Sequence, residues 1–124
     1  LFRSITVAID TTVRKSDGDF AKCSKPFAED IIDDAPVLLE QMTSDADGAQ
    51  GEWIGLVKMS GEGARLVKAE IETMEKDGSL ATANMPDLFN RLIASGVTPH
   101  VAYFSGHWLD VNDAFDLADA RNFL

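Results

Sequence analysis

The sequence predicts an α/β fold, because short apolar runs rich in β-branched residues are interleaved with segments whose apolar residues recur at helical spacing. Three runs have the character of strands, at residues 4–9, 52–59 and 97–105. Two helical segments lie between the second and third runs, and another follows the third run. This order fits an α/β or α+β domain, and 124 residues suffice for one domain with one core.

The first run has the sequence SITVAI and ends at Asp10, which predicts a buried strand with a carboxylate at its carboxyl end. Residues 15–19 have turn composition, and the irregular, acidic stretch 22–34 around Pro26 predicts a loop. Residues 35–42, APVLLEQM, fit either a strand or a short helix. Residues 52–59 predict a second strand, in which Gly55 indicates a bulge or a close backbone approach.

Capping residues delimit the two central helices. Ser60 is a good N-cap for a helix that ends at Gly78. Asn84 and Pro86 predict the start of a second helix, which stops at Gly96. The apolar face of the first helix consists of Ala64, Val67, Ile71 and Met74.

A third strand is expected at residues 97–105, and Asn112 is expected to cap a last helix. The apolar and small residues of that helix are Phe115, Leu117, Ala118 and Ala120. The strand end and the cap leave residues 106–111 as a connection between strand and helix.

Composition narrows the classes of partner. The formal net charge is -10, from 21 acidic and 11 basic residues, which disfavours nucleic acid and anionic membranes as partners. No apolar run approaches the roughly 20 residues that span a bilayer. The single Cys23 excludes an internal disulfide framework and has no Cys-His arrangement around it, so a reducing cytoplasm is the expected compartment.

Two aspartates are the candidate chemical residues. Asp10 ends a strand, and Asp110 lies between a strand and a capped helix, after Gly106. Carboxylates from neighbouring strand ends repel each other unless a divalent cation lies between them, and Mg²⁺ is usually held by one or two carboxylates together with phosphate oxygens. Aspartates at strand ends also serve as turn formers and helix caps, and Asp113 fits the first turn of the last helix.

Residues 106–113, GHWLDVND, followed by Asp116 and Leu117, resemble the closing motif of nucleotidyltransferases of the sugar-nucleotide and phosphocholine type. The stretches EWIGL at 52–56, Ser60 with GA at 63–64, and NMPDL at 84–88 narrow this resemblance to one subfamily. That subfamily is the 2-aminoethylphosphonate cytidylyltransferase domain, which is often fused behind a phosphoenolpyruvate phosphomutase domain in phosphonate biosynthesis. The resemblance is strongest from Glu52 onward, looser over residues 4–23 and faint over 25–51.

The resemblance implies a Rossmann-like, GT-A-like mixed sheet flanked by helices. The glycine-rich loop with which that family cradles the triphosphate does not occur in the chain; GEGAR at 61–65 lies instead at a helix start. Residues 1–124 are therefore expected to be the carboxy-terminal portion of one nucleotidyltransferase domain whose N-terminal half is missing. Such a portion is expected to be inactive alone.

The resemblance also implies roles for single residues. Asp10 and Asp110 match the two metal-binding aspartates of the family, with Mg²⁺ as cofactor and CTP as co-substrate. Glu52 and Asp87 are expected to meet the ammonium group of the acceptor, to which Trp53 offers a ring face. Alternatively, Glu52 is a strand-edge charge, Trp53 belongs to the core and Asp87 complements a helix dipole.

The residues before Asp110 have two interpretations. His107 is expected to donate a hydrogen bond to the neighbouring carboxylate or to a phosphoryl group, or else to pack at the strand end. Trp108 is expected to fill the core.

The leading functional hypothesis is therefore a fragment of a metal-dependent enzyme that transfers CMP from CTP to 2-aminoethylphosphonate. Its partners are small nucleotide and phosphonate substrates. One alternative is a non-catalytic packing or oligomerisation module that pairs with a second copy through an exposed sheet edge. Another is a nucleotidyltransferase that acts on phosphocholine or a sugar phosphate.

Overall fold

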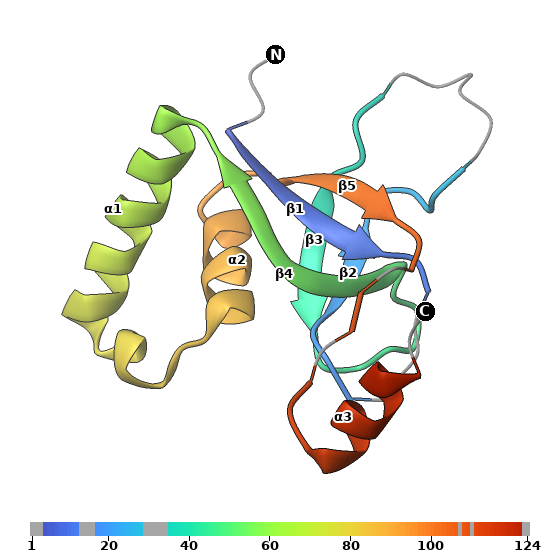
Figure 1. Ribbon diagram of the computed structural model, residues 1–124. Coiled ribbons are helices and arrows are strands. Elements are labelled where there is room, and N and C mark those ends of the chain that lie inside the picture. Colours follow the sequence, from blue (N-terminus) through green and yellow to red (C-terminus); the bar gives the residue numbers. More distant parts are fainter. Residues whose placement is uncertain (1–3, 13–16, 29–34, 107, 110, 123–124) are drawn as a thin grey trace.

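A computed structural model describes residues 4–12, 17–28, 35–106, 108–109 and 111–122 of the chain. Five strands and three α-helices are found in these residues, with one 3₁₀ turn (Figure 1). In chain order they are β1 (Ile5–Asp10), β2 (Phe20–Cys23), β3 (Leu39–Thr43), β4 (Gly51–Met59), α1 (Gly61–Asp77), η1 (Ser79–Thr82), α2 (Met85–Ala94), β5 (His100–Phe104) and α3 (Ala114–Arg121). The α/β class expected from the sequence is confirmed.

The strands form one mixed sheet in the order β3-β2-β4-β1-β5. β1 runs parallel to β5 and antiparallel to β4, and β2 runs antiparallel to both β3 and β4. At one end the two outer strands approach each other: Leu38 and His100 form an antiparallel bridge, and the Val101 amide donates to the Val37 carbonyl at 2.9 Å. Residues beside β3 thus pair with part of the outer edge of β5.

One face of the sheet carries the core. Alternate residues of β1 point to this face, and α1 and α2 lie on the same side of the sheet, next to each other (Figure 1). Phe89 of α2 is fully buried there, and its ring meets the Trp53 ring edge to face, with 5.3 Å between the centroids. Asn90 fixes α2 to β3, because its side chain accepts from the Met42 amide at 2.8 Å and donates to the Met42 carbonyl at 2.9 Å.

The helix boundaries follow the capping residues that the sequence displays. The Ser60 hydroxyl accepts from the Gly63 amide at 3.1 Å, and Gly78 ends α1 in the left-handed conformation with φ 82°. The prediction that Asn112 caps the last helix was wrong. The N-cap of α3 is Asp113, whose side chain accepts a hydrogen bond from the Asp116 amide.

β2 is a strand that the sequence pattern missed. Residues 15–19 were expected to be a turn and 22–34 a loop, so Phe20–Cys23 was assigned to no element. Four residues are too few for periodicity to distinguish a strand from a turn. Pairing with β3 and β4 gives this segment its extended form. The same pairing decides that Leu39–Thr43 is a strand rather than a helix.

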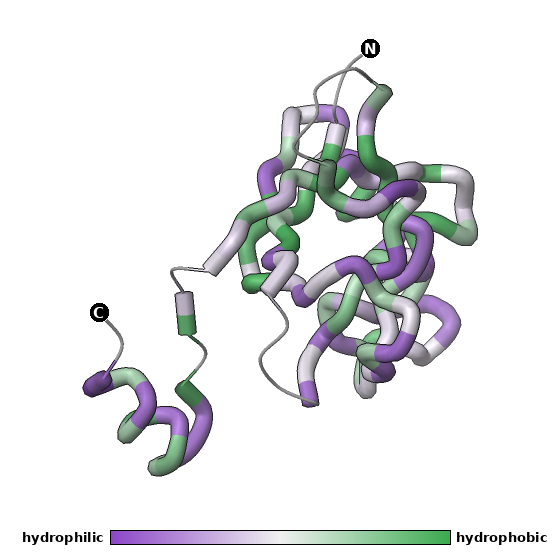
Figure 2. Tube along the Cα trace, turned by 90° about the vertical axis from the view of Figure 1, so that its right-hand side faces the viewer, coloured by the Kyte–Doolittle hydropathy of each residue, from purple (hydrophilic) through white to green (hydrophobic). Residues whose placement is uncertain are grey.

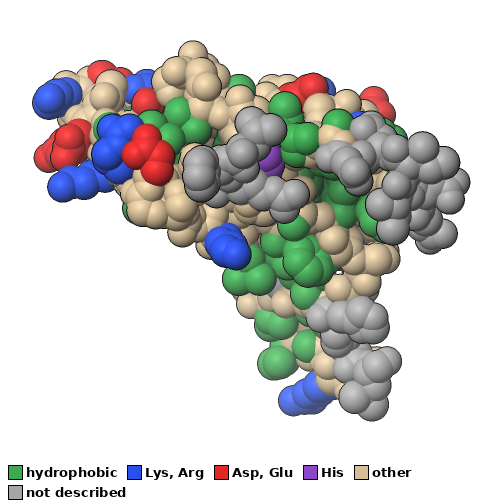
Figure 3. Space-filling model, turned by 90° about the horizontal axis from the view of Figure 1, so that it is seen from above, with side chains coloured by type: hydrophobic (Ala, Val, Ile, Leu, Met, Phe, Trp, Pro, Cys, Tyr) green, Lys and Arg blue, Asp and Glu red, His purple; other side chains and the backbone are tan. Residues whose placement is uncertain are grey.

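α3 stands away from the rest of the molecule (Figure 2). None of its residues is buried, and the Phe115 side chain is 83% exposed. In the view of Figure 3, charged side chains gather over the α1 end, while hydrophobic side chains lie along the narrower, protruding part. No helix among the described residues is long and apolar enough to cross a membrane.

Candidate functional site

The Asp10 carboxylate is the centre of the candidate site. It lies at the carboxyl end of β1 and is 0% exposed. Its Oδ1 accepts hydrogen bonds from the backbone amides of Thr12, at 2.8 Å, and of Gly106, at 3.0 Å. Its Oδ2 accepts from the indole Nε1 of Trp108. One side chain thus connects the end of β1 with the segment that follows β5.

Strand register explains why these residues meet. In the parallel pair, Asp10 lies opposite Phe104, and the Thr11 amide extends the ladder by donating to the Phe104 carbonyl at 2.9 Å. The chain that leaves β5 therefore emerges beside the end of β1. Gly106 then turns the backbone with φ 70°, a conformation that glycine adopts without steric cost. Beyond this turn, the indole of Trp108 reaches the Asp10 carboxylate.

A buried carboxylate needs donors, because an ion removed from water without them loses several kcal/mol of solvation. The three described N–H groups around Asp10 give its oxygens hydrogen bonds in place of those to water. They also orient the side chain. Carboxylates that bind metals are typically hydrogen-bonded in this way, and Mg²⁺ prefers such hard oxygen ligands. The role of Asp10 as a ligand of Mg²⁺ stays a prediction.

The second expected ligand, Asp110, and the neighbouring His107 lie outside the described residues. Their expected roles stay predictions. Among the residues that the structure does describe, no three or more His, Cys, Asp or Glu side chains gather as a metal site. The expected pair has two members, of which Asp10 alone is described.

Glu52 lies directly opposite Asp10 in the antiparallel pairing of β1 and β4, which puts both side chains on one face of the sheet. Glu52 is 7% exposed, and β4 lies between β2 and β1, so Glu52 is not a charge at a sheet edge. A Cβ atom at Gly18 would lie 2.7 Å from its Oε1, so the loop before β2 closes over this carboxylate. Two carboxylates thus occupy neighbouring positions on the face opposite α1 and α2.

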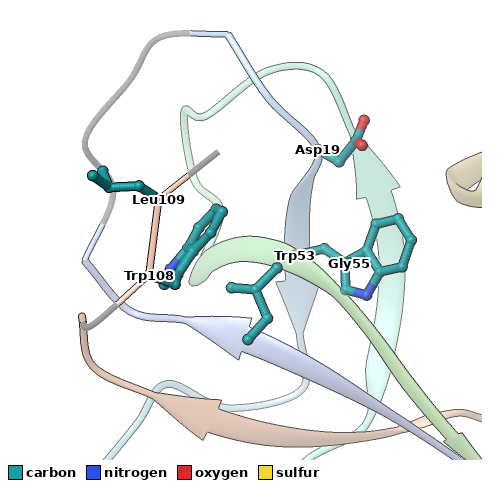
Figure 4. A pocket seen from close by; sticks show the side chains of 6 residues that line it. Asp19, Trp53, Gly55, Trp108 and Leu109 are labelled. Atoms are coloured by element: carbon teal, nitrogen blue, oxygen red, sulfur yellow. The ribbon is translucent and has the colours of Figure 1, made fainter. Parts of the chain in front are cut away.

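A cavity of about 200 Å³ lies between part of β4 and the segment that follows β5 (Figure 4). Its lining consists of Asp19, Trp53, Ile54, Gly55, Trp108 and Leu109. Figure 4 shows the two indole rings well apart rather than stacked. Asp19 was expected only as a turn residue, and nothing in its sequence neighbourhood distinguishes it from one. The approach of the loop to β4 places it at the cavity.

Trp53 belongs to the core, as in the alternative interpretation, and its expected contact with an acceptor ammonium stays a prediction. Its ring packs on Phe89 in the core, its Nε1 donates to the Leu56 carbonyl at 3.1 Å, and part of it lines the cavity. Trp108 differs from expectation. It is half-buried at the cavity rather than in the core, and its polar nitrogen meets Asp10.

Asp87 belongs to the capping box of α2. Its Oδ2 accepts from the Asn84 amide at 2.9 Å, and its own amide donates to the Asn84 side chain at 3.0 Å. Asp87 does not line the cavity described above. The structure thus gives Asp87 a helix-terminal role, as in the alternative interpretation, and its contact with an acceptor stays a prediction.

Cys23 lies in the core. Burial raises the pKa of its thiol, and the contact with Tyr103 partly offsets that rise. A high thiol pKa leaves little thiolate, which is the nucleophilic form. The environment of Cys23 therefore suits packing rather than nucleophilic chemistry.

No protein-family model, curated protein or solved structure matches this chain. The resemblance to cytidylyltransferases consequently rests on the sequence motifs quoted above alone and stays a prediction.

Proposed function

We propose that this chain is part of a Mg²⁺-dependent nucleotidyltransferase that transfers CMP from CTP to 2-aminoethylphosphonate, with a GT-A-like, Rossmann-related sheet. One observation carries the proposal. The buried Asp10 carboxylate is hydrogen-bonded to the segment that leads into Asp110. This contact supports a metal site in which Asp10 and the closing motif would take part together.

In this reaction a phosphonate oxygen of the acceptor attacks the α-phosphorus of CTP. A new P–O bond forms, the bond to the β-phosphate oxygen breaks, and pyrophosphate leaves with that electron pair. Asp10 and Asp110 would hold Mg²⁺, which would supply neutralisation of the charge on the phosphates. The enzyme would accelerate the step by positioning the two substrates, with no covalent intermediate.

The acceptor is assigned to the cavity beside β4. At about 200 Å³ it is smaller than the roughly 300–1,000 Å³ of sites for drug-sized ligands, so it suits a short aminoethyl chain. Trp53 and Trp108 present aromatic surface there, and the Asp19 carboxylate contributes negative charge. Glu52 lies on the same sheet face as Asp10 and adds to the negative potential. A cationic amine is the kind of group that such surroundings favour.

The test uses the full-length protein that carries this chain. We expect Mg²⁺-dependent release of pyrophosphate from CTP when 2-aminoethylphosphonate is present. Asp110→Ala should abolish turnover and leave the circular dichroism spectrum unchanged. Asp113→Ala is the matched control, because Asp113 lies three residues further on and caps α3 through the Asp116 amide. It should retain turnover.

Absence of pyrophosphate release with every aminophosphonate tested would show that the proposal is wrong. Pyrophosphate release with phosphocholine or a sugar phosphate, and not with 2-aminoethylphosphonate, would support nucleotidyl transfer. It would also show that the proposed acceptor is wrong.

The second candidate function is a packing or oligomerisation module, which the exposed apolar side chains of α3 favour. Phe115 is 83% and Leu117 50% exposed. Exposed apolar side chains of this kind are typical of surfaces that pack against another protein element. Measurement of the oligomeric state in solution tests this function, because a protein that stays monomeric at high concentration argues against it.

A further inference from the structure

The dipeptide Asp-Gly occurs at residues 17–18, 47–48 and 77–78 of the chain. In such a dipeptide the glycine amide nitrogen can attack the aspartate side chain, because glycine carries no side chain beside the attacking atom. Residues 47–48 lie in the connection between β3 and β4 (Figure 1), and residues 77–78 end α1. We propose that Asp47 is a site of spontaneous modification to isoaspartate, and that the structure protects Asp77 from the same reaction. This inference is independent of the proposed function.

The reaction exchanges bonds around the Asp47 side chain and needs only water. The Gly48 nitrogen forms a bond to Cγ of Asp47, a Cγ–O bond breaks, and water leaves with one proton from the carboxyl group and one from the amide. The product is a cyclic succinimide. Water then adds to the backbone carbonyl carbon of Asp47 and breaks the bond from that carbon to the Gly48 nitrogen, which takes back a proton. The main chain now runs through Cβ and Cγ, and a free α-carboxylate remains.

Both reacting groups of the Asp47-Gly48 pair are available. Within the described part of the chain, neither the Asp47 carboxylate nor the Gly48 amide makes a hydrogen bond or an ion pair. The two residues occupy the central positions of a turn, whose hydrogen bond runs from the Ala49 amide to the Ala46 carbonyl at 3.2 Å. A Cβ atom at Gly48 would meet nothing within 4 Å, so the ring has room to form.

In the Asp77-Gly78 pair both reacting groups are engaged. Oδ1 of Asp77 accepts from the Ser79 amide at 2.9 Å, and Oδ2 accepts from the Arg91 guanidinium at 2.7 Å. The Gly78 amide donates to the Glu75 carbonyl at 3.3 Å where α1 ends. Hydrogen bonds from Ser79 and then Arg91 lower the pKa of Asp77 to about 2. The carboxyl group therefore stays ionised at mildly acidic pH, and an ionised carboxylate loses its oxygen less readily than a carboxylic acid.

The two pairs are otherwise alike. All four residues are exposed, so access of water does not distinguish them. The backbone at the two glycines is similar, with φ 72° at Gly48 and φ 82° at Gly78. Hydrogen bonding of the reacting groups is thus the difference between the pairs on which the inference depends, and one chain contains both the reactive pair and its matched control.

The full-length protein is incubated at mildly acidic pH and physiological temperature, and isoaspartate at both positions is followed by peptide mapping. Protease Asp-N cleaves before aspartate and not before isoaspartate, and electron-transfer fragmentation confirms the modified position. The rate at Asp47 should exceed the rate at Asp77 about 10-fold, a factor that corresponds to about 1.4 kcal/mol of hydrogen bonding lost before Asp77 reacts. A rate at Asp47 that does not exceed the rate at Asp77 overturns the inference.

Unfolded protein separates the effect of the structure from that of the flanking sequence. In urea above the unfolding transition the hydrogen bonds around Asp77 are absent, and the two rates should become similar. If the difference persists unchanged in urea, the flanking residues cause it rather than the folded structure, and the inference is wrong.

Asp47→Glu is the matched variant, because it keeps the charge and lengthens the side chain, which closes a ring far less readily. The isoaspartate signal of the peptide that contains residues 45–50 should disappear in this variant. A signal that persists in that peptide comes from Asp45 and overturns the inference.

Discussion

Replacing Gly51 with alanine should both loosen the sheet and disturb Asp10. Gly51 is buried at the start of β4. A Cβ atom there would lie 2.3 Å from the carbonyl oxygen of Asp10 and 2.6 Å from Cγ2 of Ile9. The closer neighbour is backbone, so no side-chain rotation relieves the clash. Strand β4 must move relative to β1.

The size of that movement follows from the contact distance. Ordinary van der Waals contact begins at 3.4 Å, so the Cβ atom and the Asp10 carbonyl must separate by about 1 Å. Inserting one methyl group into a well-packed region costs about 1–3 kcal/mol, and rigid backbone on one side places Gly51→Ala near the upper end of this range. The same displacement at a catalytic carboxylate lowers turnover about 100-fold, provided that the proposed function is correct.

Urea unfolding followed by far-ultraviolet circular dichroism measures the loss of stability. Gly61→Ala is the control, because a Cβ atom at Gly61, in the first turn of α1, meets nothing within 4 Å. It should be neutral or stabilising by up to about 1 kcal/mol through helix propensity. If the free energy of unfolding of Gly51→Ala equals that of the unaltered protein, the close approach of β4 to β1 is not present in solution.

Two further predictions concern the fold. Asn90→Ala leaves the backbone amide and carbonyl of Met42 without their side-chain partner and should lower the free energy of unfolding by about 1–3 kcal/mol in urea titrations; an unchanged midpoint would mean that α2 does not depend on this contact. Hydrogen bonds from Ser79 and then Arg91 lower the pKa of Asp77 from 3.8 to about 2, so their contribution to stability is present above pH 3.8 and is lost as the pH falls to 2. The difference in unfolding midpoint between the unaltered protein and Asp77→Asn should accordingly shrink between pH 4 and pH 2, and a difference that is the same at both pH values contradicts this linkage.

Local signals in the sequence were sufficient where structure depends on neighbours in the chain. The capping residues Ser60, Gly78 and Asn84 set the ends of α1 and α2, because a cap bonds to amides only a few residues away. The runs of β1 and β4 were equally evident, because β-branched and aromatic residues are enriched in strands. Asp10 as the polar end of a buried strand followed from the same pattern.

The remaining features of the fold and of the candidate site depend on contacts between residues that are distant in the chain. The sequence alone determined the α/β class, the main helices and the candidate aspartates, because these depend on periodicity, capping and residue type. Only the tertiary structure showed that β2 is a strand and that Glu52 lies opposite Asp10. It also showed that Trp108 lies outside the core and donates a hydrogen bond to the Asp10 carboxylate. Asp10 and Trp108 are 98 residues apart in the chain and meet because β1 and β5 pair in parallel. The spacing of these residues in the sequence does not reveal that β1 and β5 pair. The register of the two strands determines which residues meet.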